Sequence, residues 1–262
     1  LESQAALARP GENGDIHIHS STQNPSEIQT VVAEALGIGF HQVVCVCKRM
    51  GGGFGGKETQ AAIPAVMVAL VASITGRPAR IAYTKDDDMR STGKRHPYKI
   101  HYKVAFTHKG KINGVRFDIY SNGGAAADLS SSVLERTLFH SDNAYYIPNL
   151  IFNGVICKTN FPPNTAFRGF GGPQGMANIE NVIQEIAIYL HKDALEIRRM
   201  NCYANRGRNI TPYGQVVKNH ILPAIIDHLA ETSRYKKRMK QVEEFNRNSQ
   251  THLRGLALTP MK

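Results

Sequence analysis

Ten residues from Arg49 to Glu58, R-M-G-G-G-F-G-G-K-E, combine five glycines with one aromatic side chain and end on a lysine followed by a carboxylate. Glycine permits positive φ angles and lets a bound group approach the backbone closely. A glycine loop between a strand and a helix presents backbone N–H groups and the positive end of a helix dipole to an anion. The stretch therefore predicts a binding loop with Glu58 at its end.

A second glycine-rich loop, A-F-R-G-F-G-G-P-Q-G, lies at Ala166 to Gly175 and also stands between an expected strand and an expected helix. The first glycine loop does not match a nucleotide phosphate loop, because Lys57 is followed by Glu and not by the Ser or Thr that would hold magnesium. The dinucleotide fingerprint is only loosely met, since no βαβ unit with a suitably spaced acidic residue follows. Two purely structural turns are the alternative, but two loops of this richness favour a ligand site.

The elements that must position these loops follow from hydrophobic periodicity and turn residues. Strands are expected at 15–19, 41–47, 80–83, 98–106, 112–120 and 151–157, with 98–106 and 112–120 forming a hairpin. Helices are expected at 25–36, 58–75, 131–140 and 176–190, and the chain from Leu195 onward is expected to be helical and polar. The pattern predicts an α+β or mixed α/β fold with helices covering at least one face of a sheet.

Composition narrows the class of protein. The chain has 262 residues, 42% of them hydrophobic, and a formal net charge of +11. The basic residues are dispersed, and the cluster from Arg234 to Lys240 is best explained as a solvated helix face. A non-enzymatic nucleic-acid-binding module is a distant alternative, because stacking on bases needs exposed aromatic side chains, and aromatic content is 8% without tryptophan.

Cysteine usage and the chain ends point to an intracellular fragment. Cys45 and Cys47 would face the same side of a strand, and their spacing differs from the C-x-x-C of zinc and redox sites. Cys157 and Cys202 stand alone, so reduced thiols in a cytosolic protein are expected. No apolar run is long enough to span a bilayer. The chain opens without Met or a signal peptide, which suggests a piece of a larger polypeptide.

Five motifs together resemble one known family. They are S-T-Q-N-P at 21–25, R-M-G-G-G-F-G-G-K-E at 49–58, G-K-R-H-P at 93–97, L-E-R-T-L-F-H at 134–140 and C-K-T-N-F-P-P-N-T-A-F-R-G-F-G-G-P-Q-G-M at 157–176. On these motifs the chain is identified as a member of the xanthine dehydrogenase/xanthine oxidase family of molybdenum hydroxylases. It resembles the N-terminal portion of the molybdopterin-binding region, over residues 1–262.

The resemblance implies a molybdopterin–molybdenum cofactor, with [2Fe–2S] clusters and FAD on partner domains or chains that pass electrons to NAD or oxygen. It implies oxidative hydroxylation of hypoxanthine to xanthine and of xanthine to urate, with water as the oxygen source. The implied partners are the C-terminal remainder of the molybdenum subunit, the iron–sulfur and FAD parts and a purine, in a cytoplasmic dimer of complete units. Neither nucleic acid nor a membrane is expected, and the implied fold is α+β, built of two-layer sandwiches with mixed sheets.

The resemblance also implies which residues meet the cofactor. Gln23 would hydrogen-bond an oxygen ligand of molybdenum. The backbone of Gly52, Gly53, Phe54 and Gly55 would pack against the metal and the pterin, where a side chain would block the cofactor. The backbone at Arg168 would face the same cofactor, while the Arg168 side chain is a candidate for a structural role.

Three side chains are implied to contact the substrate. Glu58 and Arg136 would grip a purine, with Arg136 stabilising negative charge on the heterocycle, and Phe170 would fix the plane of the ring. The alternatives are that Arg136 is an ordinary helix charge and that Phe170 belongs to the core. Aldehyde oxidases of this family usually lack the acidic residue and the Arg at these positions, so aldehyde oxidation is the second hypothesis. The family's general base, a glutamate in a G-E-P-P-like setting, has no match in this chain.

Overall fold

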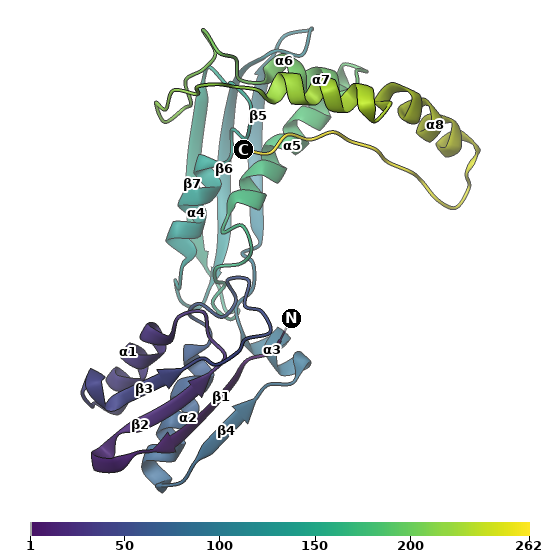
Figure 1. Cartoon of the computed structure of the whole chain (residues 1–262). Coiled ribbons are helices and arrows are strands. Elements are labelled where there is room, and N and C mark those ends of the chain that lie inside the picture. The colour runs from purple at the N-terminus through teal and green to yellow at the C-terminus, as the bar shows by residue number, and fades with distance from the viewer. Residues whose placement is uncertain (1) are drawn as a thin grey trace. The chain divides into compact units, whose positions relative to one another are not determined.

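The computed structural model describes residues 2–262 and divides into two compact units (Figure 1). Unit 1 holds the chain up to Tyr98 together with Tyr120–Glu135 and Val155–Gly171. Unit 2 holds Lys99–Ile119, Arg136–Gly154 and Gly172–Lys262. Among the helices formed by residues 2–262, none combines the length and the apolar character that crossing a membrane requires.

Unit 1 is built on a mixed sheet of four strands in the order β3-β2-β1-β4. The strands are β1 (Ala5–Pro10), β2 (Ile16–Ser20), β3 (Val43–Val46) and β4 (Ala79–Ala82). Strand β1 is antiparallel to β2 and β4, whereas β2 is parallel to β3. The predicted mixed sheet is therefore confirmed, and the parallel pair brings the carboxyl ends of β2 and β3 to the same edge.

Helices α1 (Pro25–Leu36) and α2 (Ala62–Thr75) pack on this sheet. The side chain of Asn24 caps α1 by accepting from the Glu27 N–H at 3.3 Å, and Gly37 ends the helix at a φ of 66°. The core between helices and sheet is formed by Ala6, Ala8, Ile16, Ile18, Ile28, Val32, Ala33, Val43, Ala61, Ala65, Val68, Ala69 and Ala72. Burial of these side chains is the main force that holds the two layers together.

The start of α2 corrects the sequence-based expectation of a helix from residue 58. Helix α2 begins at Ala62 and leaves Glu58 in the preceding turns. Pro64 explains the difference, because proline is tolerated in the first turn of a helix but breaks its interior. A helix from residue 58 would have placed Pro64 in the second turn.

Two further elements of unit 1 escaped the sequence analysis. Strand β1 has the sequence A-A-L-A-R-P, which lacks the β-branched and aromatic residues typical of strands, and is held by pairing on both sides. Helix α3 (Lys85–Ser91) begins with Thr84, which accepts from the Asp87 N–H at 3.1 Å. Strand β3 is shorter than expected, because Phe40–Gln42 form a 3-10 helix before it.

Unit 2 contains most of a second sheet, in the order β5-β6-β7, and most of the remaining helices. These elements are β5 (Tyr98–Phe106), β6 (Ile112–Gly124), β7 (Leu150–Lys158), α5 (Gly172–Tyr189), α6 (Ala194–Asn201), α7 (Leu222–Thr232) and α8 (Tyr235–Asn248). Helix α4 (Ser130–Phe139) belongs to unit 1 up to Glu135 and to unit 2 from Arg136. The short connection between β5 and β6 confirms the predicted hairpin, since parallel strands need a longer crossover. The apolar face expected of the helix at 176–190 is buried at Ile179, Val182, Ile183 and Ile186, whereas Met176 and Leu190 at its ends are half-buried.

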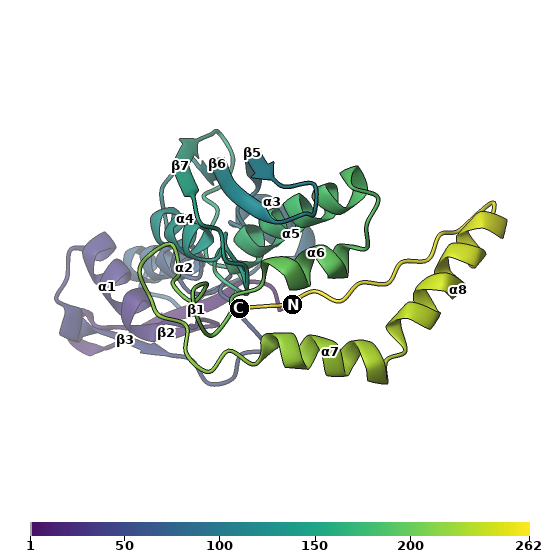
Figure 2. The ribbon, with the colours of Figure 1, turned by 90° about the horizontal axis from the view of Figure 1, so that it is seen from above.

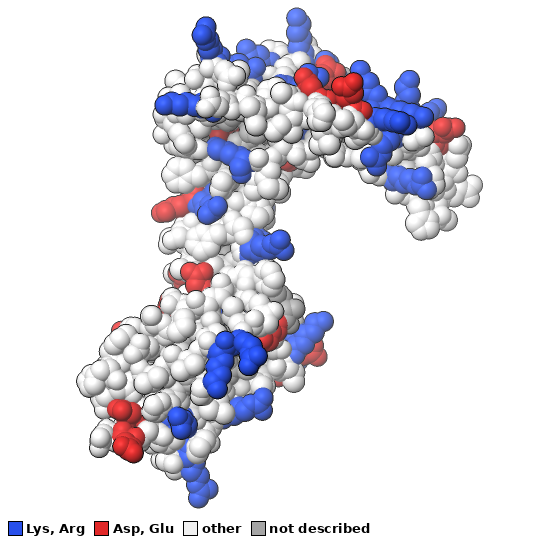
Figure 3. Space-filling view, in the orientation of Figure 1, with Lys and Arg blue, Asp and Glu red and all other residues white. Residues whose placement is uncertain are grey.

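The C-terminal part of unit 2 carries much of the positive charge. Lys and Arg side chains gather over α8 in Figure 3, and Lys236, Lys237 and Arg238 are exposed. The chain after α8 turns back alongside that helix in Figure 2, where the Arg254 N–H donates to the Asn246 side chain at 2.8 Å. The cluster from Arg234 to Lys240 is thus a solvated helix face, as the sequence predicted.

Candidate functional site

The first glycine loop meets the residues that follow β2 at one edge of the unit 1 sheet. The Oε1 atom of Gln23 accepts from the Gly55 N–H at 2.8 Å, and the Gln23 N–H donates to the Lys57 carbonyl at 2.9 Å. Parallel neighbouring strands place the loops at their carboxyl ends side by side. The S-T-Q-N-P motif and the glycine loop therefore lie side by side, and their binding role stays a prediction.

The side chain of Gln23 has a defined orientation. Its oxygen must face the Gly55 N–H, because only the oxygen of the amide can accept a hydrogen bond. Its amino group has no hydrogen-bond acceptor among the described residues of unit 1, and the residue is exposed. The loop thus leaves Gln23 with a donor that is available to an oxygen atom of a bound group.

The glycine loop has no room for side chains on its inner positions. A Cβ atom on Gly53 would lie 2.7 Å from Cδ of Gln23, and one on Gly55 would lie 2.9 Å from the Ala166 carbonyl oxygen. Gly55 also has a φ of 92°, which favours glycine. Within unit 1, the N–H groups of Gly52, Gly53 and Phe54 have no acceptor among the described residues. This row of open donors fits an anionic cofactor.

The second glycine loop packs against the first. Ala166 approaches Gly55, and the Arg168 guanidinium lies over the Phe54 ring at 5.9 Å. The Arg168 carbonyl accepts from Nη2 of Arg95 at 2.6 Å, while the Arg168 N–H has no acceptor in the described part of unit 1. The backbone of the second loop therefore adds another open donor, and the Arg168 side chain stabilises the contact between the loops.

Lys57 has a structural role that its place in the motif did not reveal. Its side chain is only 3% exposed, and Nζ donates to Glu2 at 2.7 Å, to the Ser3 carbonyl at 3.0 Å and to Ser21 at 2.8 Å. The hydrogen bonds from Lys57 and Ser21 lower the pKa of Glu2 from its usual 4.5 to about 2. Lys57 anchors the loop to the start of the chain, so it is not a phosphate-binding lysine.

Glu58 is the half-buried carboxylate at the end of the first loop. Burial raises its pKa above the usual value, and the negative charges of Glu27 and Asp128 raise it further. Among the described residues of unit 1, none forms a hydrogen bond or an ion pair with its carboxyl group. An unpaired, partly desolvated carboxyl is characteristic of a group kept for a ligand.

The other two predicted substrate residues lie in different parts of the chain. Phe170 is a half-buried residue of the second loop, in unit 1, with a φ of 50° and an N–H that donates to the Phe167 carbonyl at 2.7 Å. Arg136 is an exposed residue of α4, assigned to unit 2. The structure thus brings Gln23, Glu58, the first glycine loop and the second loop up to Gly171 together in unit 1, and the role of Arg136 stays a prediction.

Sequence reasoning missed a group of polar side chains behind the loops. Asp128 accepts from Thr59 at 2.8 Å, from Gln60 at 2.9 Å and from Thr165 at 2.7 Å. Thr59 and Gln60 follow Glu58 directly, and Thr165 precedes the second loop. No local pattern marked Asp128, since its partners lie far away in the sequence.

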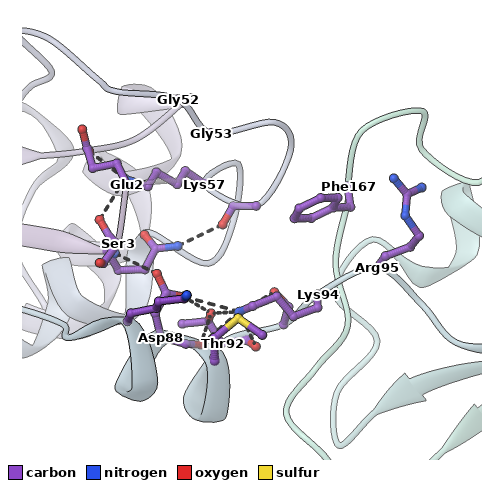
Figure 4. Close-up of a pocket in the computed structure, with 15 residues that line it drawn as sticks. Glu2, Ser3, Gly52, Gly53, Lys57, Asp88, Thr92, Lys94, Arg95 and Phe167 are labelled. Atoms are coloured by element: carbon purple, nitrogen blue, oxygen red, sulfur yellow. Dashed lines mark hydrogen bonds and ion pairs between the residues drawn. The ribbon is translucent and has the colours of Figure 1, made fainter.

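A cavity of about 440 Å³ adjoins the first glycine loop within unit 1. It is lined by Glu2, Ser3, Gln4, Gly52, Gly53, Gly56, Lys57, Lys85, Asp88, Met89, Thr92, Gly93, Lys94, Arg95 and Phe167. Figure 4 shows Phe167 and Arg95 on the side opposite Glu2 and Lys57. Neither Gln23 nor Glu58 lines this cavity, so it is separate from the predicted substrate contacts.

Comparisons with known proteins give the family. The model of the molybdopterin cofactor-binding domain matches residues 1–202. Xanthine dehydrogenase of Calliphora vicina is 47% identical over 262 residues, which is 100% of this chain and 19% of that protein. Xanthine dehydrogenase/oxidase of Rattus norvegicus is 45% identical over 263 residues, again 100% of this chain and 20% of that protein. The chain thus spans about a fifth of the length of these curated relatives.

Solved structures agree with this result. Aldehyde oxidoreductase from Desulfovibrio gigas has a TM-score of 0.81 and 29% identity, covering 95% of this chain and 26% of that one. Aldehyde oxidoreductase from Desulfovibrio desulfuricans has a TM-score of 0.82 and 27% identity, covering 93% and 26%. The α+β fold, the open donors of the glycine loops and the sequence matches lead to one conclusion. The chain belongs to the molybdopterin cofactor-binding domain family.

Proposed function

We propose that this chain provides part of the cofactor and substrate site of a molybdenum hydroxylase that oxidises hypoxanthine and xanthine. In that reaction a C–H bond of the purine becomes a C–O bond, and the oxygen comes from water. Two electrons and two protons are released for each C–H bond that is hydroxylated. The bound molybdenum cofactor would supply the two-electron oxidation. The chain's own residues would hold the cofactor and orient the purine.

The residues that would hold the cofactor are those with open donors. The amino group of Gln23 would donate to an oxygen ligand of the metal, because its oxygen is already engaged by Gly55. The N–H groups of Gly52, Gly53 and Phe54 would face the cofactor from the first loop, and the Arg168 N–H would do so from the second. Backbone donors of this kind are pre-oriented and bind anionic groups without a large entropy loss.

The purine assignment is supported above all by the Glu58 carboxyl. It is half-buried and unpaired within unit 1, and its pKa is raised above the usual value. A carboxyl that holds its proton more tightly can donate to a ring nitrogen or accept from a ring N–H. Arg136 would stabilise negative charge on the ring, and Phe170 would contact its face or edge. The identity of 47% to a xanthine dehydrogenase supports the same substrate class.

The rest of the enzyme would come from other parts of the polypeptide or from partner chains. We propose that residues 1–262 form one portion of the molybdopterin-binding region, and that the remainder supplies the general base. The [2Fe–2S] clusters and FAD would lie on the iron–sulfur and flavin parts, in a cytoplasmic dimer of complete units. Aldehyde oxidation is the second candidate, because aldehyde oxidoreductases share the fold at TM-scores of 0.81 and 0.82.

Molybdenum content and turnover of xanthine and of an aromatic aldehyde, measured on the full-length protein, test this proposal. We expect stoichiometric molybdenum and faster turnover of xanthine. Arg136→Met should lower kcat/KM for xanthine by roughly 10²–10³-fold and leave aldehyde turnover almost unchanged. Arg199→Met, which removes another exposed arginine of unit 2, is the matched control. Equal losses on both substrates would contradict the role of Arg136.

A further inference from the structure

Asp128 connects the two glycine loops of unit 1. Its Oδ2 accepts from Thr59 Oγ1 at 2.8 Å and from Gln60 Nε2 at 2.9 Å. Its Oδ1 accepts from Thr165 Oγ1 at 2.7 Å, and also from the Leu129 N–H at 2.6 Å. We call Asp128, Thr59, Gln60 and Thr165 the Asp128 cluster. One carboxylate in this cluster therefore receives donors from the end of the first loop and from the start of the second.

The carboxylate of Asp128 is held by hydrogen bonds rather than by a cation. No Lys or Arg among the described residues of unit 1 forms an ion pair with it. Hydrogen bonds from neutral donors to a carboxylate are directional and stronger than neutral pairs, so they fix geometry as well as charge. Asp128 also has a φ of 43°, a conformation that Asp and Asn tolerate better than most residues.

The cluster extends to a third segment through Gln60. Its amide donates to Asp128, and its oxygen accepts from the Gly93 N–H at 2.8 Å, so both ends of this buried side chain are engaged. The Thr165 N–H donates to the Lys94 carbonyl at 3.1 Å. The G-K-R-H-P motif is thereby joined to both glycine loops, and a shift of one segment would be transmitted to the other two.

Glu58 lies between two fixed residues. On one side, Lys57 is anchored through Nζ to Glu2 and Ser21. On the other side, Thr59 belongs to the Asp128 cluster. The Glu58 N–H closes the turn by donating to the Gly55 carbonyl at 3.3 Å. The backbone of Glu58 is therefore set from both directions, while its carboxyl group is left without a donor in unit 1.

We propose that Asp128 is a positioning residue that holds both glycine loops in register and so sets the place of Glu58. Asp128 does not meet the purine; it acts through Thr59, Gln60 and Thr165. Its negative charge also contributes, after burial and Glu27, to the raised pKa of Glu58. The catalytic consequence rests on the proposed purine function, whereas the effect on the loops does not.

Hydrogen exchange of the full-length protein tests the positioning role directly. Asp128→Asn keeps the side-chain shape and the tolerance for positive φ, but it places an amino group against other donors. We expect exchange of the hydrogen-bonded N–H groups in the two loops to become faster by about tenfold or more. These are the N–H groups of Gly55, Gly56, Glu58, Thr165 and Phe170. Asp118→Asn is the matched control, since Asp118 is a hydrogen-bonded carboxylate of unit 2.

A pair of threonine variants separates the hydroxyl from the shape of the side chain. Thr59→Val removes the donor to Asp128 at almost constant volume, whereas Thr59→Ser keeps it. We expect Thr59→Val to reproduce the faster exchange of Asp128→Asn and Thr59→Ser to resemble the unmodified protein. In turnover assays, Asp128→Asn should lower the ratio of xanthine to aldehyde kcat/KM by about fivefold or more, because only the purine uses Glu58.

These outcomes are distinguishable. Unchanged exchange in either loop, or a Thr59→Ser variant that behaves as Thr59→Val does, would overturn the positioning role. An unchanged substrate ratio in a protein that oxidises xanthine would also overturn it, because Glu58 would then be placed without Asp128. If the unmodified protein fails to oxidise purines, the proposed function fails instead, and the exchange measurements alone decide the role of Asp128.

Discussion

Gln23 Oε1 accepts a hydrogen bond from the Gly55 N–H at 2.8 Å, and this contact joins the loop after β2 to the glycine loop after β3. It also determines which end of the Gln23 amide is open. The oxygen is turned toward the loop and the amino group away from it. A side chain of the same size without an amino group would therefore keep the contact between the loops and lose the donor.

Gln23→Glu separates the contact between the loops from the open donor. A carboxylate can still accept from Gly55, but it cannot donate to an oxygen ligand of a metal. We expect the melting temperature to change little and turnover of the full-length enzyme to fall by roughly 10²–10³-fold. Calorimetry and steady-state kinetics check the two parts. A variant with normal turnover would contradict the donor role of Gln23.

Gly53→Ala tests the space beside Gln23. The new Cβ would overlap the Gln23 side chain, which can move away, so we expect a cost in folding stability of only about 1 kcal/mol. The displaced Gln23 and the filled cradle should lower molybdenum content several-fold. Elemental analysis of the purified full-length protein provides the measurement. Gly255→Ala is the control, because nothing lies within 4 Å of a Cβ at that position.

Glu58→Gln should change the dependence of stability on pH. Burial, Glu27 and Asp128 raise the pKa of Glu58 in the folded chain above 4.5. Its contribution to stability is therefore complete below pH 4.5 and is lost as pH rises through the higher folded-state pKa. Glutamine does not titrate, so the variant should gain stability relative to the unmodified protein as pH increases from 4 to 8.

Thermal unfolding across that pH range measures the difference. The exposed Glu34→Gln on α1 is a suitable control. A difference in melting temperature that stays constant from pH 4 to 8 would argue against a raised pKa for Glu58. Lower xanthine turnover in the same Glu58→Gln variant would show that the carboxyl serves function at a cost in stability.

Glu180→Gln probes a buried ion pair in unit 2. Glu180 accepts from Arg198 Nε at 2.8 Å, from Asn143 at 2.9 Å and from the Tyr145 hydroxyl. The side chains of Arg198 and Glu180 are only 5% and 15% exposed. Removal of the carboxylate leaves Arg198 buried without its counter-charge, so we expect a loss of about 3 kcal/mol in the free energy of unfolding.

Urea unfolding of the variants checks this value. Tyr145→Phe removes one donor and leaves the ion pair, so it should cost about 1 kcal/mol. Glu196→Gln breaks an exposed ion pair with Lys192 and should cost less than about 0.5 kcal/mol. Equal effects of Glu180→Gln and Glu196→Gln would show that burial does not strengthen the Glu180–Arg198 pair.

Local sequence determined much of the scaffold. Helix α1 has the bounds 25–36 that the sequence predicts, and α5 buries an apolar stripe with the period of 3.6 expected for a helix. The hairpin of β5 and β6 follows from two alternating runs around a short turn. The two glycine loops were recognisable by residue type alone, because no other residue adopts backbone conformations with positive φ as easily as glycine.

Tertiary structure decided the rest. Strand β1 has weak strand propensity and exists because β2 and β4 pair with it on both sides. Lys57 is a buried anchor and not a phosphate ligand because Glu2, 55 residues away, meets it. Asp128 reaches Thr59 and Thr165 across 69 and 37 residues. Such contacts depend on strand order and on which chain segments cross, and neither local propensity nor hydrophobic period encodes them.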